Sequence, residues 1–214
     1  MWPEADRAEW TVVVPIRGTS TSKSRLVVDG VASSELAIAF GLDVIAACRA
    51  ARSVTRTVVT TASPYLAAAA AALGAATVID DAAADLNSSI SSAVRRVRAL
   101  DPRANIAVIV GDVAMVTPAD IDEALAAAAA HPRALVCDRQ GVGTVLISAR
   151  AGLAHHPRFG GVSRVSHRAW GYREIDIDPH SRLRHDLDTQ VDLVEARARG
   201  LGAASSRLLA DAGL

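Results

Sequence analysis

The sequence predicts an α/β fold in which one mostly parallel sheet carries helices on both faces. Short β-branched or apolar runs alternate with alanine-rich or amphipathic runs along the chain, which is the order that βαβ units produce. Half of the 214 residues are hydrophobic, enough to bury a core on each face of such a sheet. No linker, repeat or charge block divides the chain, so a single domain over residues 1–214 is expected.

The first half of the chain contains the most regular elements. Helical spacing of apolar residues predicts helices over 33–50 and 86–100, and Ser33 or Ser34 is the expected N-cap of the first. Pro64 opens a further alanine-rich helix, since proline suits the first helical turn. The expected strands are rich in β-branched or apolar residues and cover 11–16, 54–61, 76–79 and 105–110.

The second half of the chain is less regular. Residues 117–120 combine the N-cap, proline and acidic residue that open a helix. Strand candidates over 135–136 and 143–148 flank the polar turn Asp138–Gly141. The remaining expectations, in chain order, are a long loop over 149–170, a strand over 172–177 and a helix from about 190 to 199.

Charge and composition exclude several classes of function. The formal net charge is zero, which argues against general binding to nucleic acid or to a membrane surface. No apolar run approaches the roughly 20 residues that span a bilayer, and the N-terminus has no signal-peptide core. Cys48 and Cys137 lack metal-ligand spacing and are expected to be buried thiols in a reducing compartment. A cytoplasmic location is therefore expected.

Lys23 is the only lysine among the 23 lysine and arginine residues. It lies in a polar loop of small residues, from Arg17 to Arg25, that follows the first expected strand. Small residues let backbone amides approach an anion, and an ammonium group is a compact partner for phosphate. The loop therefore indicates phosphate binding, with a solvated loop as the alternative.

Two carboxylates that are far apart in the sequence are the strongest candidates for chemistry. Asp112 comes after the fourth expected strand, and Asp188 lies with Asp186 in a short acidic run before the helix near 190. Ligands of open α/β sheets bind beyond the carboxyl ends of strands, where carboxylates can hold Mg²⁺ and leave positions for phosphate oxygens. The alternatives are a turn or cap for Asp112 and a helix N-cap for Asp188.

Two glycine-rich segments complete the candidate site. The glycines of Gly141–Thr144 permit close backbone approach, although a simple hairpin is the alternative. Residues 159–168 combine Gly, Ser and Arg and could close over an anionic substrate, or form a surface loop. His155, His156 and His185 have no partners at ligand spacing, so surface or structural roles are expected.

Taken in order, these segments are similar to the 2-phospholactate/phosphoenolpyruvate guanylyltransferases, which make the activated intermediate for the deazaflavin coenzyme F-420. The resemblance implies a single Rossmann-like domain of the glycosyltransferase-A type. It also implies Mg²⁺-dependent transfer of GMP from GTP to a small phosphorylated carboxylic acid, phosphoenolpyruvate or 2-phospho-L-lactate. The matching segments are Val13–Arg17, Ser22–Leu26, Asp85–Asn87, Gly111–Asp112, Asp138–Thr144, His156–Gly160, Ser163, Ser166–His167, Asp186–Thr189 and Asp192–Leu193.

The same resemblance implies roles for individual residues. The catalytic set would be Lys23, Asp112 and Asp188, with the two aspartates as the magnesium ligands. The nucleotide would be bound by Arg17, Lys23, Arg25 and Asn87. The acceptor acid would be bound by Thr144, Gly160 and Ser163.

The sequence also departs from the family pattern. Val113–Met115 lacks the proline that usually follows the strand-four aspartate, Gln190 replaces a second proline, and Arg17 stands where lysine is common. Gly161–Val162 replaces Pro–Asp before Ser163. Three alternatives therefore stay open: a related enzyme that uses CTP or another acceptor (a sugar phosphate or a molybdopterin), a catalytically silent nucleotide-binding protein, and a scaffold without a ligand. Assembly as a homodimer is also left open.

Overall fold

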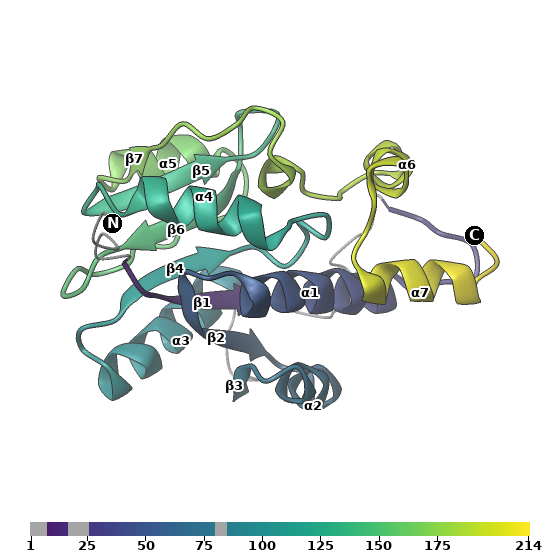
Figure 1. Cartoon of the computed structure of the whole chain (residues 1–214), viewed down its shortest axis with the longest axis horizontal. Helices are drawn as coiled ribbons and strands as arrows, with labels where there is room; N and C mark the ends of the chain where they lie inside the picture. Colours follow the sequence, from purple (N-terminus) through teal and green to yellow (C-terminus); the bar gives the residue numbers. More distant parts are fainter. Residues whose placement is uncertain (1–7, 17–25, 80–84) are drawn as a thin grey trace, which may run out of the picture.

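A computed structural model describes residues 8–16, 26–79 and 85–214, and its central element is a seven-stranded sheet with strand order β3-β2-β1-β4-β6-β5-β7 (Figure 1). The strands are β1 (Trp10–Pro15), β2 (Val54–Thr61), β3 (Ala76–Ile79), β4 (Asn105–Ile109), β5 (Arg133–Cys137), β6 (Thr144–Ala149) and β7 (Arg173–Glu174). The helices are α1 (Ser33–Ala50), α2 (Pro64–Ala72), α3 (Leu86–Leu100), α4 (Pro118–Ala128), α5 (Ser163–Ala169), α6 (Gln190–Arg199) and α7 (Ala203–Asp211), with a 3₁₀ turn η1 (Arg182–Arg184).

The sheet is mostly parallel, as the sequence predicts. β1 pairs in parallel with β2 and β4, β2 with β3, and β5 with β7. β6 is the exception, because it runs antiparallel to both β4 and β5. The turn between β5 and β6 is too short for a crossover connection, so the two strands form a hairpin.

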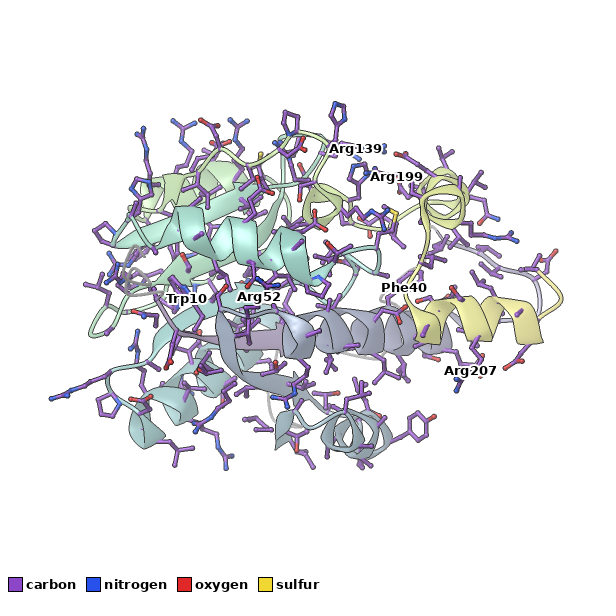
Figure 2. The ribbon with its side chains drawn as sticks, viewed as in Figure 1. Trp10, Phe40, Arg52, Arg139, Arg199 and Arg207 are labelled. Carbon is purple, nitrogen blue, oxygen red and sulfur yellow. The ribbon has the colours of Figure 1, made fainter. Side chains whose placement is uncertain are left out.

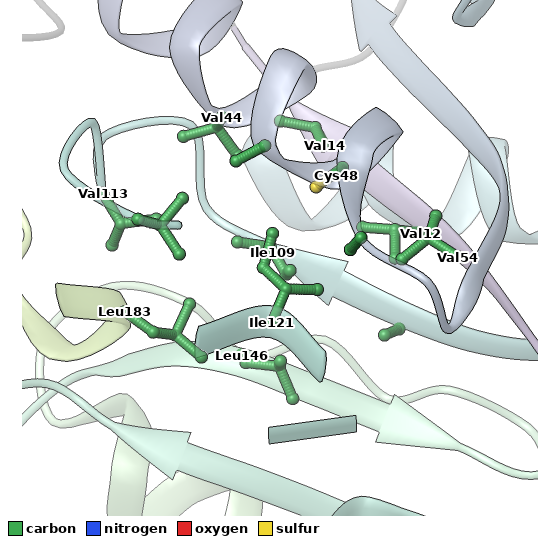
Figure 3. Close-up of a cluster of buried hydrophobic side chains, with 14 of the residues drawn as sticks. Val12, Val14, Val44, Cys48, Val54, Ile109, Val113, Ile121, Leu146 and Leu183 are labelled. Atoms are coloured by element: carbon green, nitrogen blue, oxygen red, sulfur yellow. The ribbon is translucent and has the colours of Figure 1, made fainter. Parts of the chain in front are cut away.

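Each face of the sheet has its own core, because strand side chains alternate between faces. On β1, Val12 and Val14 belong to one cluster and Val13 to the other. The first cluster, part of which is shown in Figure 3, packs the sheet against α1 and α4 through residues such as Val44 and Ile121. The second packs the other face against α3. Cys48 and Cys137 are free, buried thiols, as expected.

A third cluster lies where α1, α6 and α7 meet. Leu36 and Phe40 of α1 pack there with Leu193 of α6, Leu209 of α7 and the loop residue Leu187. Figure 1 shows α7 lying along α1, with α6 above it. This cluster fixes the segment between η1 and α6, which carries Asp186 and Asp188.

Several boundaries differ from the sequence-based expectation. The N-cap of α1 is Ala32, not Ser33 or Ser34, because the Ala32 amide donates to the Glu35 carboxylate at 2.9 Å. Ser63 caps α2 ahead of Pro64, as predicted.

The expectations for the last third of the chain were less accurate. The loop expected over 149–170 contains α5, and the strand expected over 172–177 is only β7. Only Ser163 and His167 of α5 are buried, too few to give a helical pattern of apolar residues. α7 was not expected at all. Its N-terminus is held by the distant Asp43 carboxylate, which accepts from Ala204 and Ser205 N–H at 2.8 and 3.0 Å. Among the described residues no helix is long and apolar enough to cross a membrane.

Candidate active site

A backbone hydrogen bond links Asp112 to Leu187, the residue before Asp188, and so connects the segments of the two predicted metal aspartates. Asp112 follows β4 in a turn, and Asp188 lies between η1 and α6. The N–H of Leu187 donates a 3.1 Å hydrogen bond to the carbonyl oxygen of Asp112. The Leu187 side chain is buried in the third cluster, so the contact is anchored. Residues 76 positions apart in sequence, 112 and 188, are thereby brought to the same end of the sheet.

Carboxylates are concentrated at this point. The pKa of Asp186 is raised to about 7, first by burial and then by the negative charges of Asp112, Asp188 and Asp138. A cation would relieve this repulsion, and carboxylate oxygens are ligands that Mg²⁺ prefers. Across the described ranges no group of three or more His, Cys, Asp or Glu side chains is arranged to hold a metal. Asp112 and Asp188, whose charges act on Asp186, are the carboxylates at this point that could hold a metal ion.

The position of Asp188 is set by the start of α6. The N-cap is Thr189, whose hydroxyl accepts from the Asp192 N–H, so helix capping is not the role of Asp188. The Asp192 carboxylate accepts from Asp188 N–H at 3.2 Å and from Thr189 N–H at 2.8 Å. Arg139 then pairs with Asp192 at 3.2 Å and with Glu195 at 2.5 Å. Figure 2 shows Arg139 reaching towards α6 from the other side of this segment.

The turn between β5 and β6 is organised by Asp138. Its carboxylate accepts from Val142 N–H at 2.9 Å and from Gly143 N–H at 2.7 Å. A Cβ at position 143 would lie 2.5 Å from Asp138 Oδ2, so only glycine allows this approach. The hairpin reading of Gly141–Thr144 is thus confirmed, and the hairpin also presents a candidate acceptor-binding hydroxyl at Thr144.

Thr144 and Ser163 are brought together by the docking of α5 on this turn. Arg164 donates from its backbone N–H to the Val142 carbonyl at 3.2 Å and from its guanidinium to the Gly141 carbonyl at 2.9 Å. Both candidate hydroxyl residues are buried. Ser163 Oγ would lie 3.8 Å from a Cβ at Gly143, next to Thr144.

Asn87 contacts the loop that carries Gly160. Its side-chain amide donates to the Phe159 carbonyl at 3.0 Å, and its Oδ1 accepts from Phe159 N–H at 2.8 Å. Gly160 follows with φ of 104°, a conformation that favours glycine. Asn87 therefore fixes the candidate acceptor loop, and its role near the nucleoside stays a prediction. A polar groove of about 580 Å³ runs from Asn87 along α3, where Arg95 and Arg158 supply positive charge.

The predicted nucleotide-binding residues Arg17, Lys23 and Arg25 lie outside the described residues. The point at which their segment leaves the sheet is defined. Ile16 N–H donates to the Thr60 carbonyl at 3.0 Å. A Cβ at Gly111 would lie 2.9 Å from Ile16 Cγ1 and 3.0 Å from the Pro15 carbonyl. Ile16, the last described residue before these positions, therefore lies in contact with Gly111, which precedes Asp112.

His155 has the structural role that the sequence indicates. It is held by the Ile106 carbonyl at 3.0 Å and by the Tyr172 hydroxyl at 3.1 Å, and burial lowers its pKa to about 4. His156 stacks on Trp170 with ring centroids 4.5 Å apart. Sequence reasoning missed the roles of four other residues. Arg139 and His167 act through long-range contacts, whereas Asp138 and Asp192 accept from backbone N–H groups three to five residues away.

Solved structures similar to this one share its fold. A putative nucleotide-diphospho-sugar transferase from Desulfovibrio desulfuricans G20 superposes with a TM-score of 0.66 at 16% identity, covering 95% of each chain. A 4-diphosphocytidyl-2C-methyl-D-erythritol synthase superposes with a TM-score of 0.64 at 13% identity, covering 90% of this chain and 99% of its own. The sheet order and these neighbours define the class as the glycosyltransferase-A type nucleotidyltransferase fold.

Sequence relatives narrow the class to a family. The model of the CofC-like guanylyl transferases matches residues 10–213. A phosphoenolpyruvate guanylyltransferase from Thermomonospora curvata is 37% identical over 202 residues, covering 94% of this chain and 89% of that protein. A protein of the same name from Streptomyces avermitilis is 38% identical over 208 residues, covering 94% and 96%. The chain belongs to the CofC-like guanylyl transferase family, and the reaction class is guanylyl transfer.

Proposed function

We propose that this protein transfers GMP from GTP to phosphoenolpyruvate or 2-phospho-L-lactate, with release of pyrophosphate and with a requirement for Mg²⁺, in coenzyme F-420 biosynthesis. The observation that carries the proposal is the hydrogen bond between Leu187 and Asp112, since it brings Asp188 to the strand end that bears Asp112. The names of the relatives from Thermomonospora and Streptomyces support phosphoenolpyruvate as the acceptor.

The reaction needs positioning and charge neutralisation more than proton transfer. A phosphate oxygen of the acceptor attacks the α-phosphorus of GTP. The new P–O bond forms as the bond to the β-phosphate oxygen breaks, and pyrophosphate leaves with that electron pair. The attacking phosphate is already ionised, so no general base is required. Asp112 and Asp188 would hold the magnesium ion, which when bound neutralises charge on the α-phosphate.

The remaining candidate residues divide between the two substrates. The cationic side chains Arg17, Lys23 and Arg25 would neutralise the triphosphate and the leaving pyrophosphate. Thr144, Gly160 and Ser163 would hold the acceptor. Their contacts support this role. Arg164 joins α5 to the turn before Thr144, and His167 of α5 contacts both Thr144 and the Arg158 backbone before Gly160.

Pyrophosphate release tests the reaction and the acceptor together. The purified protein is given GTP and Mg²⁺ with phosphoenolpyruvate, 2-phospholactate or 3-phosphoglycerate separately. Release with phosphoenolpyruvate or 2-phospholactate supports the proposal and names the acceptor. GTP binding without release with any acid indicates a different acceptor or a silent nucleotide-binding protein. A competition panel with CTP, ATP and UTP then tests the choice of nucleotide.

One observation favours a second candidate, transfer to a different acceptor by the same chemistry. Gly160 and Gly161 both have positive φ, and a Cβ at either position would meet no described atom within 4 Å. Gly161–Val162 stands where the family pattern has Pro–Asp, so the acceptor loop carries less side-chain volume and one fewer negative charge. A larger or more anionic acid would then support faster release than phosphoenolpyruvate.

A further inference from the structure

His167 is buried directly behind the candidate acceptor-binding turn. Its ring packs edge-on against Phe159 and Tyr172, with centroids 5.0 and 5.4 Å away, and its side chain has no solvent exposure. Both ring nitrogens have partners. Nε2 lies 2.9 Å from the Arg158 backbone N–H, and Nδ1 lies 3.0 Å from the Thr144 hydroxyl oxygen.

These partners determine which nitrogen carries the proton. A backbone N–H can only donate, so Nε2 of His167 must accept from Arg158 with its lone pair. Burial lowers the pKa of His167 to about 4, which keeps the ring neutral near pH 7. A neutral imidazole has one N–H, which must therefore lie on Nδ1. Nδ1–H then donates to the Thr144 oxygen at 3.0 Å, and the Ser163 backbone, one turn earlier on α5, also interacts with the ring and partly opposes the lowering of its pKa.

The donated hydrogen bond fixes what Thr144 can offer to a ligand. A hydroxyl has one proton and two lone pairs. With a lone pair occupied by His167, the Thr144 proton is directed away from the ring. The hydroxyl then faces its ligand as a donor, and the partners that suit a donor best are acceptor-only groups such as an ionised carboxylate or a phosphate.

We propose that His167 is a positioning residue that orients the Thr144 hydroxyl as a hydrogen-bond donor to an anionic oxygen of the acceptor substrate. The inference rests on the proposed function, in which Thr144 binds that substrate. His167 also holds Arg158, while Asn87 holds the next residue, Phe159. The two side chains together fix the backbone immediately before Gly160, so one buried ring sets both a side-chain donor and the adjoining loop.

The proposal predicts a specific kinetic pattern. His167→Phe keeps the aromatic packing and removes both hydrogen bonds, so the KM of the acceptor acid should rise about tenfold while the KM of GTP stays unchanged. Thr144→Val should do the same. Because His167 acts partly through Thr144 and partly through the Arg158 backbone, the double variant should exceed Thr144→Val by less than the full effect of His167→Phe. Multiplied effects in the double variant, or an unchanged acceptor KM in His167→Phe, would overturn the proposal.

Two further variants separate positioning from loss of structure. The amide of His167→Asn can replace Nδ1–H as donor to Thr144, so it should recover most of the acceptor affinity that His167→Phe loses. His155→Phe is the matched control. It removes a second, partly buried histidine with two hydrogen bonds, and it should lower the melting temperature without changing the acceptor KM. If the asparagine variant recovers stability but no affinity, the role of His167 is only structural.

A spectroscopic measurement tests the inference independently of turnover. ¹H–¹⁵N correlation of the imidazole resonances in the wild-type protein near pH 7 should place the His167 proton on Nδ1. A proton on Nε2 would refute the orientation of Thr144 even if guanylyl transfer is observed. Conversely, a proton on Nδ1 together with no pyrophosphate release from any acceptor would count against the proposed function and leave the geometry of His167 and Thr144 standing.

Discussion

The N–H of Leu187 and the carbonyl of Asp112 form a 3.1 Å hydrogen bond that joins the end of β4 to the segment before α6. The contact is made by backbone atoms, and the Leu187 side chain is only 1% exposed. It can therefore hold Asp112 and Asp188 in register without either carboxylate taking part. The backbone of the fold thus supplies the spacing of these two residues at the end of the sheet.

The first prediction concerns these two carboxylates. Asp112→Asn and Asp188→Asn keep side-chain size and remove one negative charge each. Each variant should lose at least about 100-fold in the rate of pyrophosphate release, because the negative charge proposed to hold Mg²⁺ is reduced. EDTA should abolish the wild-type activity and added Mg²⁺ should restore it.

Stability distinguishes this loss from unfolding. Removing a negative charge from a crowded group of carboxylates relieves repulsion on Asp186, so neither variant should melt below the wild-type protein in metal-free buffer. A variant that keeps full activity, or wild-type activity that survives EDTA, would contradict the assignment of these aspartates as metal ligands.

The second prediction concerns the single lysine. Lys23→Ala should lower turnover with GTP far more than it lowers the free energy of unfolding, because its compact positive charge is expected to act on phosphate. Lys23→Arg keeps the charge with a different shape and should retain part of the activity. Steady-state kinetics and urea unfolding measure the two effects separately. Full activity in Lys23→Ala would refute the phosphate role.

The third prediction follows from the way α6 begins. The Asp192 carboxylate holds the backbone of Asp188 and Thr189 and pairs with Arg139. Asp192→Ala should cost on the order of 1 kcal/mol of stability through the lost cap. Turnover should also fall about tenfold or more, because Asp188 is no longer held in place.

Ser63→Ala provides the matched control for this variant. Ser63 caps α2 by accepting from Leu66 N–H at 3.2 Å, and α2 packs beside β2 and β3, away from Asp188. A similar loss of stability is expected, with normal turnover. If both variants lose stability but neither loses activity, the cap of α6 does not position the site.

The fourth prediction tests the turn before Thr144. Gly143→Ala would place a methyl group 2.5 Å from Asp138 Oδ2. The carboxylate must then move and release its two backbone N–H partners, at a cost of about 1–3 kcal/mol. The KM of the acceptor acid should also rise, because the turn that positions Thr144 is displaced. Val142→Ala, in the same turn but half exposed, should change stability by less than about 0.5 kcal/mol. Equal effects of the two substitutions would contradict this account.

The sequence predicted the elements in which the pattern of apolar residues matches the pattern of buried side chains. The continuous apolar run of β1 and the spacing of Ile90, Val94 and Val97 on α3 reflect burial in the two main cores, and both elements were found as expected. α5 and α7 escaped prediction because distant residues hold them. Arg164 docks α5 on the β5–β6 turn, and Asp43 holds the start of α7.

The site shows the same division. Asp112 and Thr144 could be selected because they follow an apolar run and a glycine turn, and Asp188 because it lies in a short acidic run before a helix. The residues that hold them could not, since Asp192 resembles an ordinary helix cap and His167 a polar residue in a loop. Sequence patterns thus identify residues at the ends of predicted elements, but they do not predict the hydrogen bonds that hold those residues in place.

The last prediction is a pH dependence of stability that comes from His155. Its pKa is lowered from 6.5 to about 4 by burial, with smaller effects from Arg98, Arg133 and His156. The unfolded chain therefore binds a proton below pH 6.5 that the folded protein binds only near pH 4. Keeping His155 neutral therefore contributes fully to the free energy of unfolding above pH 6.5. Below that pH the free energy of unfolding falls, by up to about 1.4 kcal/mol per pH unit.

A difference between variants isolates this effect. His167 acts in the same direction and Asp186, whose pKa is raised to about 7, in the opposite one, but both are present in every protein compared. His155→Phe should be less stable than wild type at pH 7.5. Urea unfolding should show that this difference in the free energy of unfolding (the stability gap) is smaller by about 2 kcal/mol at pH 5. Tyr172→Phe removes a hydrogen-bond partner of His155 but keeps the histidine, so its gap should stay nearly constant. A constant gap for His155→Phe as well would mean that the folded protein protonates His155 as readily as the unfolded chain does.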